Sequence, residues 1–125
     1  MLSFLRVTKN LISNKQQILD KVKLPQKATV TRIIDGDTIG IDNGMRIRYI
    51  GINAPETRHP PKAVEYFGRE ASSFNKKLVF GKEIFLEYDI QKFDKYGRVL
   101  AYVYINDIFV NAKLVEEGYA QVFTV

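Results

Sequence analysis

The dipeptide Asn43-Gly44 constrains the fold of this chain most strongly, because it separates two short runs that are typical of β-strands. Both residues tolerate a positive φ, which a tight hairpin turn requires. The turn therefore predicts an antiparallel pair of strands, over residues 38–41 and 45–52. A β-branched run over residues 28–34 predicts another strand before this hairpin.

In the strand predicted over residues 45–52, side chains should alternate between two faces. One face would carry Arg46, Arg48, Ile50 and Ile52, and the other would carry Ile47 and Tyr49. Arg48 would then lie inside a strand among apolar residues, where an unpaired charge is costly. A nearby carboxylate or a bound phosphate would satisfy it, because guanidinium geometry suits the oxygens of both.

Apolar residues at three- and four-residue steps predict a helix over residues 63–80, with Gly81 at its C-terminal end. The remaining predicted elements are strands over 82–90, 98–105 and 108–110 and a small helix over 111–117. This order predicts a mainly β protein with helices, of the α+β class. A five-stranded OB-type barrel with a helix after the third strand has this arrangement, which recurs in oligonucleotide binders.

The chain is expected to divide into an N-terminal helical extension, residues 1–26, and a barrel domain, residues 27–125. Within the extension, apolar residues form one stripe over residues 8–22 and lysines fall elsewhere, which predicts an amphipathic helix. This pattern favours packing against the domain or self-association with a neighbouring chain. The apolar stripe is narrow, so a helix on a membrane surface is the weaker alternative.

The composition fits one globular domain, because 46% of the 125 residues are hydrophobic. The 19 basic and 14 acidic residues give a net charge of +5. This favours polyanionic partners such as nucleic acid, although a merely soluble basic protein has the same balance. The absence of cysteine excludes disulfides and thiolate metal sites. No apolar run has transmembrane length, and no signal peptide is expected in the chain.

Asp35 and Asp37 flank Gly36, so on an extended chain both carboxylates would point to the same side. Two such carboxylates repel each other unless a cation or an arginine lies between them. Hard cations such as calcium take oxygen ligands of this kind. The alternative is an ordinary turn, in which Asp-Gly-Asp is common.

Glu56 follows Pro55, which would hold the glutamate at a fixed angle. A glutamate beside a cation can orient or deprotonate a water that attacks phosphorus. A second arginine, Arg98, occurs after a predicted turn and could stabilise developing phosphate charge. Each of these residues alone is also compatible with a surface charge. Together with Arg48 and the aspartates they predict a metal-dependent phosphodiesterase.

Between about Ala28 and Val122, five short motifs follow one another in the order and with the spacing of one known protein family. They are Ile-Asp-Gly-Asp-Thr at 34–38, the stretch from Arg48 to Glu56, Thr-Arg-His-Pro at 57–60, Asp-Lys-Tyr-Gly-Arg-Val-Leu-Ala-Tyr at 94–102 and Leu-Val-Glu-Glu-Gly-Tyr-Ala at 114–120. In this combination the chain resembles the staphylococcal (micrococcal) nuclease, or thermonuclease, family.

The resemblance implies an OB-type barrel and a calcium-dependent nuclease that hydrolyses DNA and RNA to products bearing a 3′-phosphate. It implies that Asp37, Asn53 and the backbone carbonyl of Ala54 bind calcium, with Asp35 in the outer shell. Asn53 is a departure, because the family usually has a second carboxylate there. An amide oxygen can still bind calcium, but one negative charge is missing.

The resemblance also implies the roles of the other residues. Glu56 would position or activate the attacking water, and Arg48 and Arg98 would hold the phosphate and stabilise its transition state. Further candidates for contact with the substrate are Lys62, Lys95 and Tyr96.

The end of the chain departs from the family pattern as well. Thr124 stands where the family often has a tyrosine near the bound base, and Val125 precedes the family's final helix. The alternative to an enzyme is therefore a non-catalytic OB-fold module that binds single-stranded nucleic acid or a protein partner. Retention of Arg48, Glu56 and Arg98 favours the enzyme, because a binding module does not need that combination.

Overall fold

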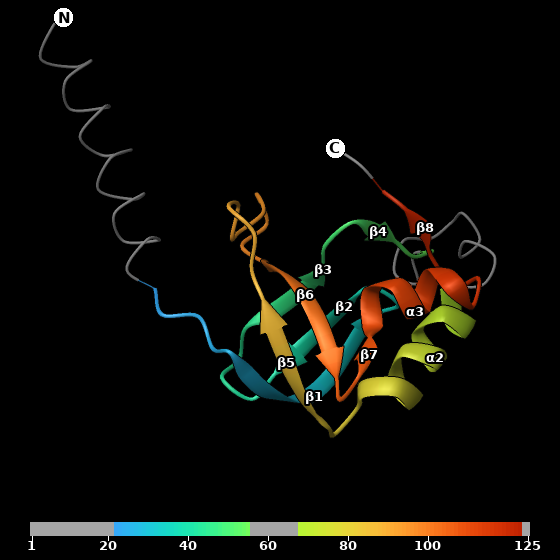
Figure 1. The fold of residues 1–125 in the computed structure, drawn as a ribbon, viewed down its shortest axis with the longest axis horizontal. Helices are drawn as coiled ribbons and strands as arrows, with labels where there is room; N and C mark the ends of the chain where they lie inside the picture. Colours follow the sequence, from blue (N-terminus) through green and yellow to red (C-terminus); the bar gives the residue numbers. More distant parts are fainter. Residues whose placement is uncertain (1–21, 56–67, 124–125) are drawn as a thin grey trace, which may run out of the picture.

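The computed structural model of the chain describes residues 22–55 and 68–123 (Figure 1). The amphipathic helix predicted over 8–22 and the start of the helix predicted at 63 lie outside the described residues, apart from Val22. Within the described part, no helix is long and apolar enough to cross a membrane.

Eight strands and two helices make up the described fold. The strands are β1 (Lys27–Asp35), β2 (Thr38–Ile41), β3 (Arg46–Tyr49), β4 (Ile52–Asn53), β5 (Glu83–Glu87), β6 (Val99–Ile105), β7 (Ile108–Phe109) and β8 (Gln121–Val122). The helices are α2 (Gly68–Val79) and α3 (Val110–Glu116).

Five of the strands close into a barrel. Hydrogen bonding joins the strands in the order β3-β2-β1-β5-β6, and a parallel pairing of β3 with β6 completes the circle. The hairpin of β2 and β3 forms at Asn43-Gly44, where Gly44 has a φ of 87°. The predicted five-stranded OB-type barrel, with a helix after the third strand, is thus confirmed.

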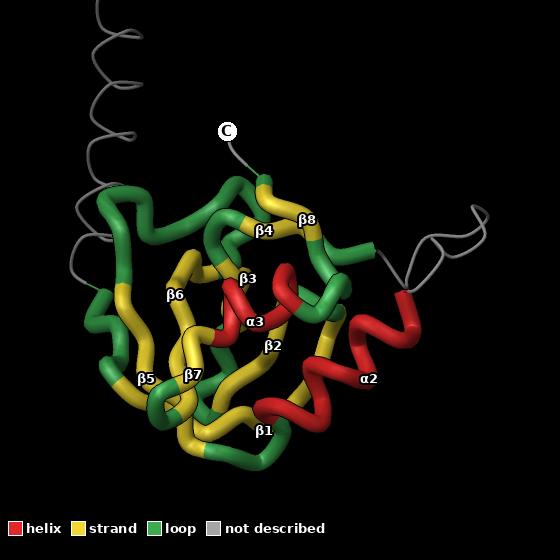
Figure 2. Tube along the Cα trace, turned by 45° about the vertical axis from the view of Figure 1, so that its right-hand side comes forward, coloured by secondary structure: helices red, strands yellow, loops and turns green. Residues whose placement is uncertain are grey.

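The two helices lie next to each other on one side of the barrel, α2 beside β1 and α3 beside β6 (Figures 1 and 2). The core consists of the inward side chains of the strands and the facing residues of the helices. On β6 every second residue is buried, from Val99 to Ile105, as the period of a strand requires. The short pair β4–β8 lies outside the barrel circle.

Two boundaries differ from the sequence-based predictions. The strand predicted to run to residue 52 ends at Tyr49, because Gly51 adopts a φ of 80° and redirects the chain. Ile52 therefore joins the core instead of sharing a face with the arginines. The strand predicted over 82–90 ends at Glu87, and the side chain of Ile90 is 95% exposed.

Candidate functional site

The turn between β1 and β2 is packed so tightly that only glycine fits at its centre. A Cβ atom on Gly36 would lie 2.8 Å from Cβ of Ala71 in α2 and 2.9 Å from Cβ of Ala54. Helix α2 and the segment after β4 therefore meet directly at this turn. The close approach fixes the position of the next residue, Asp37.

The carboxylate of Asp37 is held on both oxygens. It is 6% exposed, and its Oδ1 accepts a hydrogen bond from the Thr38 hydroxyl at 2.9 Å. Its Oδ2 accepts a hydrogen bond from the backbone N–H of Ala54 at 2.8 Å. Hydrogen bonds to an ionised carboxylate are strong, so the orientation of Asp37 is fixed before any ligand binds.

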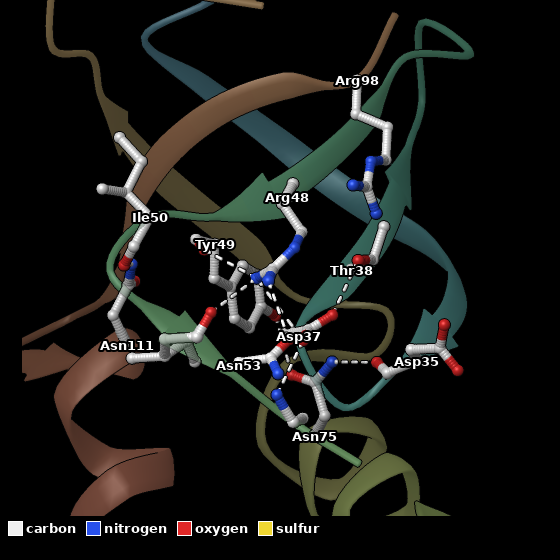
Figure 3. A network of polar contacts seen from close by, with 12 residues as sticks. Asp35, Asp37, Thr38, Arg48, Tyr49, Ile50, Asn53, Asn75, Arg98 and Asn111 are labelled. Atoms are coloured by element: carbon white, nitrogen blue, oxygen red, sulfur yellow. Dashed lines mark hydrogen bonds and ion pairs between the residues drawn. The ribbon is translucent and has the colours of Figure 1, made fainter. Parts of the chain in front are cut away.

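Asp35 and Asp37 do not act as a parallel pair. In Figure 3 the carboxylate of Asp37 faces Thr38 and Arg48, whereas the carboxylate of Asp35 lies on the far side of its own backbone from Asp37, because Gly36 and Asp37 form a turn and not a continuous strand. The expectation that both lie on the same side is therefore wrong, and the turn alternative describes the backbone here. Asp35 is half-buried.

The guanidinium group of Arg48 bridges the residues predicted to bind calcium. Its Nη1 lies 3.4 Å from Oδ2 of Asp37, and its Nη2 donates a hydrogen bond to Oδ1 of Asn53 at 3.2 Å (Figure 3). Nη1 also donates to the carbonyl oxygens of Tyr49, at 2.9 Å, and Ile52, at 2.8 Å. The chain reverses after β3 and wraps around the side chain of Arg48. The carbonyl oxygens of this segment, with Asp37 and Asn53, therefore supply the polar partners that a half-buried charge requires.

Arg98 is held by Asp94 within the turn that precedes β6. Its Nε donates to Oδ2 of Asp94 at 2.6 Å, and Oδ1 accepts the backbone N–H groups of Tyr96 and Arg98, each at 2.9 Å. Burial opposes the ionisation of Asp94, but hydrogen bonds from the backbone and side chain of Arg98 outweigh it and lower the pKa of Asp94. In Figure 3, Arg98 points toward Thr38, next to Asp37.

The same turn carries Tyr96, whose side chain is 61% exposed. Nζ of Lys95 lies 5.2 Å and the guanidinium carbon of Arg98 5.3 Å from the centre of its ring. Both distances are within the range of cation–π attraction. The carbonyl oxygen of Tyr96 accepts a hydrogen bond from Nη2 of Arg46 at 2.7 Å, which ties the turn to β3.

A buried polar chain beneath the turn was missed by the reasoning from sequence. The hydroxyl of Tyr49 donates to Oδ1 of Asn75 at 2.7 Å, and Nδ2 of Asn75 donates to the carbonyl oxygen of Asp35 at 3.0 Å. Burial raises the pKa of Tyr49 far above its ordinary range, so the hydroxyl stays protonated as a donor. The available signal was an asparagine on the apolar face of the predicted helix, four residues after Ala71.

A second buried asparagine supports the reversal after β3. Nδ2 of Asn111, in α3, donates to the carbonyl oxygen of Ile50 at 2.8 Å. Its Oδ1 accepts the backbone N–H of Val103 at 2.9 Å. Asn111 therefore connects α3, β6 and the segment that wraps around Arg48. Sequence reasoning placed it only at the start of a small helix.

Two of the predicted site residues, Glu56 and Lys62, lie outside the described residues. Asp37, Arg48 and Asn53 come together, with Ala54 bonded to Asp37 through its N–H. Arg98 points toward Thr38, beside Asp37, and carries with it the turn on which Lys95 and Tyr96 lie (Figure 3).

The donor atoms fit a hard cation. The carboxylate of Asp37 and the amide oxygen of Asn53 converge on one positively charged group, the guanidinium of Arg48. Oxygen atoms of this type are the preferred ligands of calcium. No three His, Cys, Asp or Glu side chains within residues 22–55 and 68–123 are grouped closely enough to hold a metal ion. In this part of the chain, amide and carbonyl oxygens would have to complete such a site.

A family model described as staphylococcal nuclease homologue matches residues 46–125. The chain belongs to this family. The matched range contains the two arginines of the site, Arg48 and Arg98, together with Asn53. The predicted family is thereby confirmed.

Curated relatives agree with this membership. A thermonuclease of Staphylococcus intermedius is 47% identical over 95 residues, which cover 74% of this chain and 56% of the relative. A thermonuclease of Staphylococcus hyicus is 43% identical over 99 residues, 77% of this chain and 59% of the relative. Endonuclease YncB of Bacillus subtilis is 45% identical over 98 residues, 75% of this chain and 46% of the relative. The chain spans about half the length of these relatives.

Proposed function

We propose that this chain is a calcium-dependent nuclease that hydrolyses phosphodiester bonds of DNA and RNA and leaves 3′-phosphate products. One observation carries the proposal: Asp37, Arg48 and Asn53 converge at the barrel end toward which Arg98 points. Support also comes from the family, whose relatives are named thermonuclease and endonuclease. We infer that residues 27–125 form the catalytic domain and residues 1–26 an extension.

The proposed metal ligands are Asp37, Asn53 and the carbonyl of Ala54, with Asp35 in the outer shell. Calcium held there would supply positive charge to the phosphate oxygens. The fixed orientation of Asp37 supports this assignment, because both of its oxygens are already directed by Thr38 and Ala54. A preorganised ligand loses little freedom when a cation binds.

The two arginines act on the phosphate in this proposal. Asp94 engages Nε of Arg98, and no described residue accepts a hydrogen bond from its two Nη nitrogens. These nitrogens can therefore meet an anion in a bidentate manner. Arg48 would turn from Asp37 and Asn53 to the phosphate when the metal binds. Both guanidinium groups would stabilise the charge that develops in the transition state.

Glu56 is assigned to the attacking water. It would accept a proton from the water while the water oxygen bonds to phosphorus. The bond from phosphorus to the 5′ oxygen then breaks, and the departing oxygen takes up a proton from solvent, which leaves a 3′-phosphate on one product and a 5′-hydroxyl on the other. Lys62, Lys95 and Tyr96 would contact the rest of the substrate, and the exposed ring of Tyr96 suits stacking with a base.

A second candidate function is a non-catalytic module that binds single-stranded nucleic acid. It is favoured by one feature, the amide of Asn53 where a second carboxylate is usual in the family. Such a module would bind nucleic acid and leave it intact with calcium present. Cleavage by the parent protein excludes this candidate.

The experiment compares cleavage of single-stranded DNA by the parent, Glu56→Gln and Arg98→Ala. Each variant should lower the rate by about two orders of magnitude or more, because each removes a group that acts in the transition state. Glu70→Gln, in the exposed first turn of α2, is the matched control and should cleave at the parent rate. If Glu56→Gln or Arg98→Ala cleaves like the control, the assigned role of that residue is wrong.

A further inference from the structure

Two arginines outside the proposed catalytic set lie on either side of Gly40. In the barrel register, Arg32 of β1 pairs with Gly40 of β2, which in turn pairs with Arg46 of β3. Side chains that are directly opposite across neighbouring strands share one face. Both arginines are exposed. The outer face of the barrel therefore carries two guanidinium side chains in one row across three strands.

The glycine between them allows a close approach. A Cβ atom on Gly40 would lie 3.2 Å from both Cβ and Nε of Arg32 and 3.6 Å from its Nη2. The side chain of Arg32 thus lies over Gly40 and extends from β1 toward β3. A larger residue at position 40 would displace the side chain of Arg32. The absent side chain lets Arg32 lie across β2, on the face that also carries Arg46.

Neither arginine is neutralised within the described part of the chain. No carboxylate in residues 22–55 or 68–123 forms an ion pair with Arg32 or Arg46. The hydrogen bond from Nη2 of Arg46 goes to a neutral acceptor, the carbonyl oxygen of Tyr96. Two like charges on one face repel each other unless an anion lies between them. The row is therefore suited to a negatively charged group.

The row is placed one step along β3 from Arg48. Arg46 and Arg48 are two residues apart on the same face, a separation of roughly 7 Å at the rise of a β-strand. This is close to the separation of successive phosphates in an extended single strand. The face of an OB barrel over its second and third strands, together with the loop before the last strand, is where such proteins bind oligonucleotides. The turn that carries Tyr96 is this loop, and Arg46 is bonded to it.

We propose that Arg32 and Arg46 form a phosphate-binding pair for the nucleotide next to the one held at Arg48. This inference rests on the proposed function and extends it, because it supplies a path for the nucleic-acid strand away from the cleaved bond. Arg46 has a second effect in this arrangement, since it fixes the backbone of the turn on which Tyr96 and Arg98 are carried.

The test measures binding without cleavage. The full chain binds a single-stranded oligothymidylate of about 12 nucleotides in the presence of a chelator, over a range of salt concentrations. The variants are Arg46→Met and Arg32→Met, which keep most of the aliphatic stem and remove the charge. Lys77→Met is the control, because Lys77 is exposed on α2 and its loss changes the net charge equally.

Log affinity falls as log salt concentration rises. Each arginine variant should make this dependence shallower, with a slope smaller in magnitude by about 0.7, the value for one phosphate contact on a single strand. Lys77→Met should keep the parent slope, and Arg46→Lys should restore most of it. Arg32→Met separates charge from turn geometry, because no described hydrogen bond joins Arg32 to the turn. The proposal is overturned if either Arg32→Met or Arg46→Met keeps the parent slope.

Cleavage in calcium is measured on the same proteins. If the two arginine variants show the expected loss of slope but the parent leaves DNA intact, the proposed nuclease function is wrong and the proposed phosphate-binding pair stands. If the parent cleaves DNA, but Arg32→Met and Arg46→Met show the same salt dependence of binding as the parent, the phosphate-binding pair is wrong and the proposed nuclease function stands.

Discussion

Nη1 of Arg48 lies 3.4 Å from Oδ2 of Asp37, so the carboxylate proposed as the main calcium ligand already faces a cationic group. The two opposite charges balance each other, and Asn53 accepts a hydrogen bond from the same guanidinium without adding charge. Calcium would therefore compete with Arg48 for Asp37. Release of the guanidinium would make it available to a phosphate, which couples metal binding to substrate binding.

Asn53→Asp should lower the calcium concentration that gives half-maximal cleavage. The substitution adds a second carboxylate beside Asp37, and the number of charged ligands tunes calcium affinity. Arg48 already donates to position 53, so it would offset much of the added repulsion in the absence of metal. A calcium titration of cleavage rate and of melting temperature measures the effect, since a ligand that binds the folded state raises stability.

The matched control for this titration is Asn106→Asp, which adds the same charge in the exposed turn between β6 and β7. It should leave the calcium midpoint unchanged. If Asn53→Asp and Asn106→Asp behave alike, position 53 does not contact the metal and the ligand assignment fails there.

Gly36→Ala should destabilise the fold by about 1 to 3 kcal/mol, the usual cost of overpacking. The added methyl group would lie within 3 Å of the Cβ atoms of both Ala71 and Ala54. The position of Asp37 should shift with the turn, so calcium-dependent cleavage should fall as well. Chemical denaturation measures the stability change.

Adding Ala71→Gly to Gly36→Ala separates packing from other effects of the alanine. It removes one of the two close contacts, at the usual cost of a glycine in a helix. The double variant should therefore be less destabilised than the sum of the two single variants. Strict additivity would show that the contact with Ala71 is not the source of the cost.

Asp94→Asn should flatten the dependence of stability on pH in the acid range. The pKa of Asp94 is lower in the folded chain than in the unfolded chain, so the folded state binds fewer protons there. Its contribution is present above the ordinary aspartate pKa of about 3.9 and is lost as the pH falls through the folded pKa. Melting temperatures from neutral to acidic pH measure this slope. Asp107→Asn, which removes one carboxylate from an exposed turn, is the matched control for the change in charge.

Local signals in the sequence were sufficient for the barrel. Asn43-Gly44 indicated the β2–β3 hairpin, and a run over residues 98–105 that is apolar on both faces indicated β6, whose alternate residues are buried in the structure. The end of β3 was predicted wrongly, because alternation continued through Gly51 although its backbone turns there. A glycine in the sequence permits a positive φ, but its presence alone does not predict that the chain turns there.

The candidate site was recognised through motifs, whereas its supports depend on contacts between distant segments. Asn75 reaches the carbonyl of Asp35 across 40 positions of the chain, and Asn111 reaches Ile50 across 61. A single sequence carries no signal for such pairs beyond a polar residue on an apolar face. The bridge from Arg48 to Asn53 likewise depends on the reversal at Gly51, which the predicted continuous strand did not contain.

The central claim is metal-dependent cleavage of nucleic acid, and degradation of single-stranded DNA by the full chain tests it most directly. With calcium, the DNA should be degraded to fragments that end in 3′-phosphate, and a chelator should stop the reaction until excess calcium restores it. Asp37, in the β1–β2 turn, and Asn53, in the short strand β4, would supply only oxygen ligands, which suits calcium better than the strict octahedron of magnesium. Equal degradation in chelator, or intact DNA in calcium, would contradict the account.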